Sequence, residues 1–313
     1  PHLVRAARPE CLVACAPGHE CAIHHQPIHC AFAAARITPV AGPVHVAFMP
    51  LRLVGKAHQQ IVPVALQFAH APRQQESKRH TVIATHQPGQ AVNGGRHPLP
   101  QREIVAQWLG GLGIHNGMQI VVYDRNKGHY CGRLWWMLKW LGHDAVAILD
   151  GGLQAWQEAG GEVATGNTPS AAVRAVHFEL KTPLRSLVLT PTVAAHLGHP
   201  AQTIVDARAG ARYRGEVEPL DPVAGHIPGA LNRPFTDNFT EDGRYKPADV
   251  LKAEWAPLLA GRPASSVVHH CGSGVTAVPN LIAMELAGFG PTALYAGSWS
   301  EWCRTPGLPC AQG

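Results

Sequence analysis

The strongest chemical signal in this sequence is a cysteine in a short loop that contains glycine. Residues 266–277 read SVVHHCGSGVTA, an apolar stretch typical of a buried strand, then Cys271, and then a predicted helix beginning near Val275. Gly272 and Gly274 can adopt positive φ, so backbone N–H groups can converge on the sulfur, and the helix start adds partial positive charge. The loop therefore favours the thiolate, which is the nucleophilic form of cysteine.

Other interpretations of this segment can be weighed from the residues themselves. A buried structural cysteine after a strand is the plainest one, and the loop glycines count against it. A protein phosphatase would need arginine at position 277 to bind phosphate with its planar guanidinium, but Ala277 is there. A cysteine hydrolase would need a base. His269 and His270 point to opposite faces of an extended strand, so neither is obviously placed for that role.

The elements that must position this loop occur twice in the chain. Val121–Asp124 recurs as Val267–His270, and Leu141–Trp156 recurs as Ala287–Trp302, both with an offset of 146 residues. Two segments that share one offset indicate two homologous domains with alternating strands and helices. This alternation predicts α/β architecture, with a parallel sheet covered on both faces in each domain.

The first copy of the repeat lacks the cysteine and its beginning. The offset aligns Cys271 with Arg125, so we expect one active site per chain, in the second domain. Carried further back, it should place a counterpart of Asp206–Asn232 at about residues 60–86, where nothing matches. The first domain is therefore expected to be incomplete.

Residues 1–95 differ in composition from the rest. They are rich in His, Ala, Pro and Gln, they contain no Asp, and the apolar stretches Val44–Leu53 and Ile61–Phe68 keep no regular period. We expect a poorly ordered segment, explained either by a reading-frame or joining error or by a divergent native extension. A zinc site is the alternative, although the spacings lack the paired knuckles of known fingers. Its candidate ligands are Cys11, Cys15, Cys21, Cys30, His19, His24, His25 and His29.

Four motifs in the second half resemble the tandem-domain rhodanese family of sulfurtransferases, which includes thiosulfate and 3-mercaptopyruvate enzymes. They are DARAGARYRGEVEP, GHIPGALN, CGSGVTA and GSWSEW, in that order. The resemblance is close over Ile204–Trp302, looser over Pro98–Gly160 and absent over residues 1–95. It implies two tandem rhodanese-like domains, each a parallel sheet flanked by helices, the first incomplete and inactive.

This resemblance also sets the expected boundaries. Residues 1–95 form the anomalous segment, 96–166 the partial domain, 167–185 a linker and 186–313 the catalytic domain.

The resemblance implies a ping-pong reaction. Cys271 takes a sulfane sulfur from a small anionic donor, becomes a persulfide and passes the sulfur to a thiophilic acceptor such as cyanide, a thiol or thioredoxin. Arg212 would bind the donor's anionic group, which suits the guanidinium fork, and Ser273 would help to move a proton. From the residues alone, a surface salt bridge is the more common role for an arginine such as Arg212, and Ser273 is equally well explained as a loop hydroxyl bonded to backbone. No metal or other cofactor is required.

The same resemblance assigns the remaining site residues. The substrate-binding loop would be completed by Gly272, Gly274, Val275 and Thr276. Structural roles go to Asp206, Arg208, His226, Asn232, Trp299 and Trp302.

The loop favours 3-mercaptopyruvate as the donor. Thiosulfate enzymes of the family tend to carry basic residues directly after the cysteine, whereas mercaptopyruvate enzymes resemble the Gly-Ser-Gly of this chain. A second arginine usual in the family is absent from Leu220–Ala224, so thiosulfate is the alternative donor. Because the first domain lacks a segment that would line the site, a poorly active pseudoenzyme or sulfur-carrier binding module is a further alternative.

Composition narrows the class of protein. The chain has 313 residues, 46% hydrophobic and 15% charged, which is a globular composition, and no apolar run reaches the roughly 18 residues of a membrane span. The net charge of +5 comes from scattered basic residues, so we expect no nucleic-acid partner. Eight cysteines are too dilute for a disulfide scaffold and Pro1 begins no leader pattern, so we expect a reducing, cytoplasmic setting.

Overall fold

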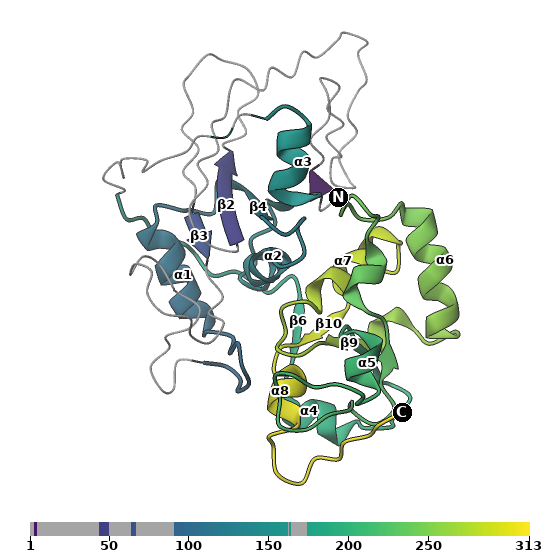
Figure 1. Ribbon diagram of the computed structural model, residues 1–313. Helices are drawn as coiled ribbons and strands as arrows, with labels where there is room; N and C mark the ends of the chain where they lie inside the picture. The colour runs from purple at the N-terminus through teal and green to yellow at the C-terminus, as the bar shows by residue number, and fades with distance from the viewer. Residues whose placement is uncertain (1–2, 5–43, 50–63, 67–90, 162, 164–173) are drawn as a thin grey trace.

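Two five-stranded sheets organise the molecule, one in each half of the chain (Figure 1). The computed structural model describes residues 3–4, 44–49, 64–66, 91–161, 163 and 174–313. The zinc candidates of the N-terminal segment lie outside these residues. No helix in the described ranges is long and apolar enough to cross a membrane.

The first sheet has the strand order β1-β5-β4-β2-β3, and the second has the order β6-β10-β9-β7-β8. The strands are β1 (Leu3–Val4), β2 (Val44–Met49), β3 (Val64–Leu66), β4 (Gln119–Asp124), β5 (Val146–Leu149), β6 (Ser186–Val188), β7 (Thr203–Asp206), β8 (Leu231–Asn232), β9 (Val267–His270) and β10 (Ala293–Tyr295). The α-helices are α1 (Arg102–Gly111), α2 (Gly132–Trp140), α3 (Gly152–Glu158), α4 (Thr190–Ala195), α5 (Gly210–Tyr213), α6 (Ala248–Leu259), α7 (Val278–Leu286) and α8 (Ser298–Trp302). Two 3₁₀ turns complete the set, η1 (Phe235–Asn238) and η2 (Ala264–Ser266).

The internal repeat is visible in these elements. A shift of 146 residues carries α2 onto α7 from first residue to last, and it carries the starts of α3 and α8 onto each other. It also superposes the ends of β4 and β9 and of β5 and β10. Each half therefore repeats one strand, loop, helix and strand unit, as the α/β prediction requires.

The two sheets differ in strand direction. All neighbours in the second sheet are parallel. In the first sheet β1, β5 and β4 are parallel, but β2 runs antiparallel to both β4 and β3, so the expected wholly parallel sheet is limited to three strands. The difference lies at β2, which takes the place beside β4 that the parallel strand β7 holds beside β9.

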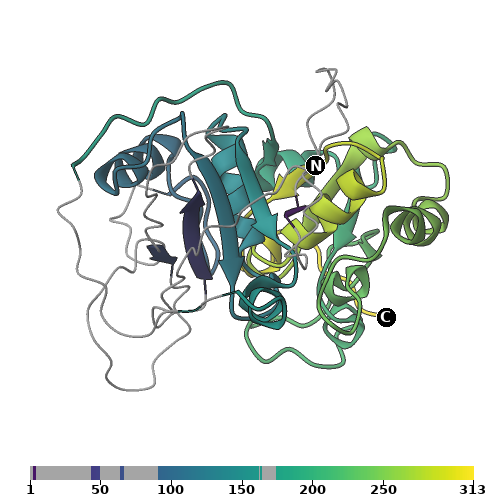
Figure 2. The same cartoon turned by 90° about the horizontal axis from the view of Figure 1, so that it is seen from above.

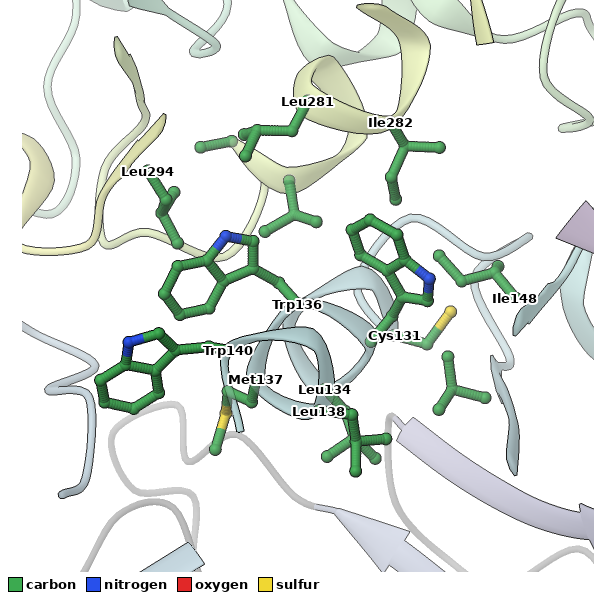
Figure 3. Close-up of a cluster of buried hydrophobic side chains, with 14 of the residues drawn as sticks. Cys131, Leu134, Trp136, Met137, Leu138, Trp140, Ile148, Leu281, Ile282 and Leu294 are labelled. Atoms are coloured by element: carbon green, nitrogen blue, oxygen red, sulfur yellow. The ribbon is translucent and has the colours of Figure 1, made fainter. Parts of the chain in front are cut away.

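Both domains share one buried core. Every residue of α2 is buried, and this helix packs against α7 of the other domain (Figure 3). The two helices approach closely near their starts, because a Cβ atom at Gly132 would lie only 3.1 Å from Cγ1 of Val278, its counterpart in the repeat. Figure 2 shows the elements of the two halves on either side of this contact. The two equivalent helices thus cross at equivalent positions.

Candidate active site

Cys271 follows β9 at its carboxyl end and is 1% exposed. The backbone N–H groups of Ser273 and Gly274 donate to its Sγ over 3.5 and 3.2 Å. Gly274 has a φ of +75°, and a Cβ there would clash with the carbonyl oxygen of Ala296, whereas Gly272 does not need the left-handed region. The loop therefore presents two amide donors to the sulfur.

Hydrogen bonds from α8, which contains most of the GSWSEW motif, hold the loop in place. The N–H of Trp299 donates to the carbonyl of Cys271 over 3.0 Å, and the N–H of Ser300 donates to the carbonyl of Gly272 over 2.9 Å. The N–H of Cys271 in turn donates to Oγ of Ser298 over 3.1 Å. Trp299 itself is fully buried and donates its indole N–H to the carbonyl of Val223. This motif fixes the backbone of the cysteine loop.

The remaining loop residues lie before α7, which begins three residues later than expected. Val275 is buried and Thr276 is half-buried, and both belong to a turn. The helix starts at Val278 because Pro279 occupies its first turn, where the fixed φ of proline suits a helix start. The amide donors at Sγ therefore come from the turn itself.

The first domain reaches this loop through three side chains that the sequence analysis missed. Nδ1 of His97 lies 2.7 Å from Oγ of Ser273. Nη1 of Arg133 donates to the carbonyl of Gly274 over 2.8 Å, and Nη2 donates to the carbonyl of His97 over 3.3 Å. The third is Arg96, whose guanidinium lies over Gly272. The loop that follows Cys271 is thus in contact with side chains of both domains.

A short sequence similarity includes two of these residues, although it does not keep the 146-residue offset of the repeat. Gly95-Arg96-His97 resembles Gly243-Arg244-Tyr245, with a glycine, an arginine and an aromatic ring before the helices α1 and α6. Each segment contacts the other domain. The backbone N–H of Tyr245 donates to the carboxylate of Asp150 over 2.9 Å, whereas His97 contacts Ser273 through its side chain.

Arg133 is fully buried inside α2. Burial lowers the pKa of Arg133 to about 10, and the nearby Cys271 opposes that shift. No carboxylate of the described residues forms an ion pair with it. Because the guanidinium is still protonated at neutral pH, it places a buried positive charge near the sulfur.

Arg212 lies at the same edge of the loop. Its Nη2 and Nε donate to the carboxylate of Glu218 over 2.6 and 3.2 Å, and the side chain is 18% exposed. A Cβ atom at Gly272 would lie 3.5 Å from Nη1 of Arg212. The guanidinium that sequence resemblance assigns to substrate binding is therefore next to the loop of Cys271.

The two histidines before Cys271 do not act on its sulfur. Burial lowers the pKa of His269 to about 3 and also lowers the pKa of His270, against the opposing effect of Asp206. Nδ1 of His270 lies 3.1 Å from the carbonyl oxygen of Cys271, not from Sγ. Among the described residues, the groups within hydrogen-bond distance of Sγ are the two amides. The geometry does not favour a cysteine hydrolase.

The other motif residues hold the second domain together. Arg208 forms a buried ion pair with Asp206 at 2.6 Å and also donates to the carbonyl of Gly225. Asn232 donates to the carbonyls of Asp206 and Arg208 over 3.0 and 2.9 Å. His226 stacks on Tyr213 with ring centroids 3.8 Å apart, and Trp302 is fully buried.

The equivalent loop of the first domain is closed by its own chain. The carboxylate of Asp124 accepts the N–H groups of Asn126, Gly128, Tyr130 and Cys131 over 2.7 to 2.9 Å. Asp124 is the counterpart of His270. The N–H of Gly274 meets a sulfur, whereas the N–H of its counterpart Gly128 meets a resident carboxylate; the counterpart of Ser273, Lys127, donates to Gln154 instead. Within the described ranges, no cluster of three or more His, Cys, Asp or Glu is arranged for a metal ion.

Comparison with known protein families identifies the family of this chain. The rhodanese-like domain model matches residues 77–159 and 190–305. The chain belongs to the rhodanese family. All four motifs of the second half fall inside the second match, and the first match begins at residue 77, ahead of the expected boundary at 96.

Several members of the rhodanese family resemble this chain over most of their length. The probable 3-mercaptopyruvate sulfurtransferase of Pseudomonas aeruginosa is 47% identical over 220 residues, 70% of this chain and 76% of that protein. The putative thiosulfate sulfurtransferase SseB of Mycobacterium tuberculosis is 40% identical over 225 residues, with the same two coverages. The solved structure of 3-mercaptopyruvate sulfurtransferase from Leishmania major is 31% identical, with a TM-score of 0.62, covering 73% of this chain and 63% of that one.

Proposed function

We propose that this chain is a sulfurtransferase that moves the sulfur of 3-mercaptopyruvate to a thiophilic acceptor through a persulfide on Cys271. The observation that carries this proposal is the pair of amide donors at Sγ, 3.2 and 3.5 Å away, in a loop whose counterpart in the first domain is filled by a carboxylate. Such donors stabilise a thiolate, and they stabilise an anionic persulfide equally well. The names of the relatives support the same reaction.

In the first half-reaction, the Cys271 thiolate attacks the sulfur of 3-mercaptopyruvate. The Sγ–S bond forms and the carbon–sulfur bond breaks, and its electron pair leaves as the enolate of pyruvate. The enolate takes a proton and becomes pyruvate. Ser273 is suited to deliver that proton, because its hydroxyl lies 2.7 Å from Nδ1 of His97. The imidazole of His97 can then supply a new proton to the hydroxyl. Val275 and Thr276 complete the turn beside the reacting sulfur.

In the second half-reaction, the acceptor attacks the outer sulfur of the persulfide. The new bond forms on that sulfur, and Cys271 leaves as the thiolate. Cyanide or a small thiol serves as acceptor, and thioredoxin is a protein thiol of the same class. The four cysteines within the described ranges are free thiols, which agrees with the reducing, cytoplasmic setting that this proposal includes.

Thiosulfate is the second candidate donor, and a 40% identical relative named as a putative thiosulfate sulfurtransferase favours it. Its anionic end would also suit Arg212. The two donors are distinguished by measuring kcat/KM for each on one preparation, with cyanide as acceptor. A higher value for 3-mercaptopyruvate supports the proposal, and a higher value for thiosulfate replaces it.

The Cys271→Ser variant tests the chemistry. We expect no sulfur transfer from either donor, and mass spectrometry should find one extra sulfur atom on Cys271 of the native chain after incubation with donor. Turnover in the variant would reject the mechanism. A persulfide that forms without turnover would instead identify a sulfur-carrier module.

A further inference from the structure

We propose that Arg96 is a second substrate-binding residue, which holds the carboxylate of the donor together with Arg212. This inference rests on the proposed function and extends it, because it places part of the substrate-binding site in the first domain. Arg96 lies in the segment immediately before α1, far from Cys271 in the sequence.

The two arginines point at one position beside the nucleophile. A Cβ atom at Gly272 would lie 2.8 Å from Nη2 of Arg96 and 3.5 Å from Nη1 of Arg212. Residue 272 directly follows Cys271, so the two guanidinium groups, one from each domain, end over the same point next to the reacting sulfur. Glycine at this position leaves that point free of side-chain atoms.

The ends of the two guanidinium groups that face Gly272 have no hydrogen-bond partner among the described residues. Arg96 uses Nη1 to bind Oδ1 of Asp221 at 2.5 Å, and Arg212 uses Nε and Nη2 to bind Glu218. Nη2 of Arg96 and Nη1 of Arg212 therefore remain available for hydrogen bonds to a ligand. The side chains are 25% and 18% exposed, so a small anion can reach them.

Buried carboxylates fix these arginines in place. The side chain of Asp221 is fully buried and lies 2.5 Å from Arg96, 2.9 Å from Arg304 and 3.6 Å from Arg212. Asp221 is thus shared among three guanidinium groups, and Glu218 holds Arg212 from another side. These carboxylates orient Arg96 and Arg212 while Nη2 of Arg96 and Nη1 of Arg212 stay directed toward Gly272.

The chemistry of the donor fits this arrangement. A carboxylate has two oxygens and can accept charge-assisted hydrogen bonds from a guanidinium on each side. When the sulfur of 3-mercaptopyruvate meets Sγ of Cys271, the length of the donor molecule would place its carboxylate beyond Gly272. The Arg96 backbone is itself anchored, since its N–H donates to Oγ of Ser300 over 3.0 Å. This anchor is independent of the side chain, so substitution of the side chain should leave it in place.

The test compares Arg96→Gln with Arg304→Gln. Both substitutions remove a partner of Asp221, but only Arg96 is among the groups nearest to position 272. We expect Arg96→Gln to raise KM for 3-mercaptopyruvate about 10- to 100-fold with kcat changed less than about threefold, as loss of a charge-assisted hydrogen bond predicts. Arg304→Gln should leave KM within about twofold. Arg96→Lys should recover part of the loss.

An unchanged KM in Arg96→Gln would overturn the inference. An equal rise of KM in Arg304→Gln would also overturn it, because the effect would then come from Asp221, the partner that both arginines share. Binding of pyruvate to the Cys271→Ser chain by calorimetry tests the site without turnover. Weaker pyruvate binding after adding Arg96→Gln supports the inference, and equal binding overturns it. If the native chain fails to use 3-mercaptopyruvate, the proposed function fails, while the pyruvate measurement still decides the role of Arg96.

Discussion

Arg133 is a buried cation that serves the loop of the other domain. Its bond to the carbonyl of Gly274 fixes the residue whose N–H donates to Sγ, and its charge lies near Cys271. Removing it leaves a buried carbonyl without a partner, which costs about 1 to 3 kcal/mol.

For Arg133→Met we therefore expect kcat/KM to fall at least about tenfold and alkylation of Cys271 by iodoacetamide at pH 7 to slow by a similar factor. Lys139→Met is the matched control, because Lys139 is the other buried cation of α2 and pairs with Asp144 instead. Equal losses in the two variants would show a packing effect of α2 alone.

The buried imidazole of His269 should make the free energy of unfolding depend on pH. Its pKa is about 3 in the folded chain against 6.5 as the ordinary value, so the unfolded chain binds the proton first as pH falls. Stability contributed by the neutral imidazole is therefore complete above pH 6.5 and is lost as pH falls from 6.5 toward 3. Between pH 7 and pH 5 this loss is about 2 kcal/mol.

The His269→Phe variant should remove that part of the pH dependence. Tyr123 occupies the equivalent position in β4 and is buried, so an aromatic ring suits the strand. Neither ring nitrogen of His269 has a hydrogen-bond partner among the described residues, so the substitution breaks no such bond. Urea unfolding at pH 7 and pH 5 measures the effect, with exposed His177→Phe as control. An unchanged pH slope would contradict the argument.

At the scale of elements, the turn between β9 and α7 depends on Gly274. Alanine there combines an unfavourable φ of +75° with a clash against the carbonyl of Ala296. We expect Gly274→Ala to lower kcat/KM at least about 100-fold and to cost more than about 3 kcal/mol of unfolding free energy.

Gly288 offers the control for that prediction. It follows α7 with a φ of +83°, and a Cβ there would meet no atom within 4 Å. Gly288→Ala should therefore cost only about 1 kcal/mol, from backbone strain, and leave kcat/KM nearly unchanged. Denaturant unfolding and donor kinetics compare the two. Similar losses in both would mean that the clash with Ala296 is relieved by small movements.

The elements around Cys271 could largely be predicted from the sequence. The strand before the cysteine and the offset of 146 residues both depend on local patterns, and the structure confirms them in β9 and in the pair α2 and α7. The antiparallel β2 could not be predicted, because strand direction depends on pairing between distant segments. The roles of Arg96 and Arg133 were not predicted for the same reason, since their partners lie more than 100 residues away in the sequence.

At the scale of the whole molecule, the shared core predicts that the two domains unfold together. Leu281 of α7 is fully buried in the core that also contains α2. Leu281→Ala should cost about 2 to 5 kcal/mol and shift a single calorimetric transition of the entire chain. Two separate transitions, with only one displaced, would show that the domains are thermodynamically independent.

The Gly-Arg-aromatic segments link each half of the chain to the other. One segment lies against Ser273 of the second half, and the other lies against Asp150 of the first half. The loop that contains Cys271 is therefore completed only when the first half is present. The isolated second half should consequently be a poor catalyst that gains activity when the first half is supplied in trans.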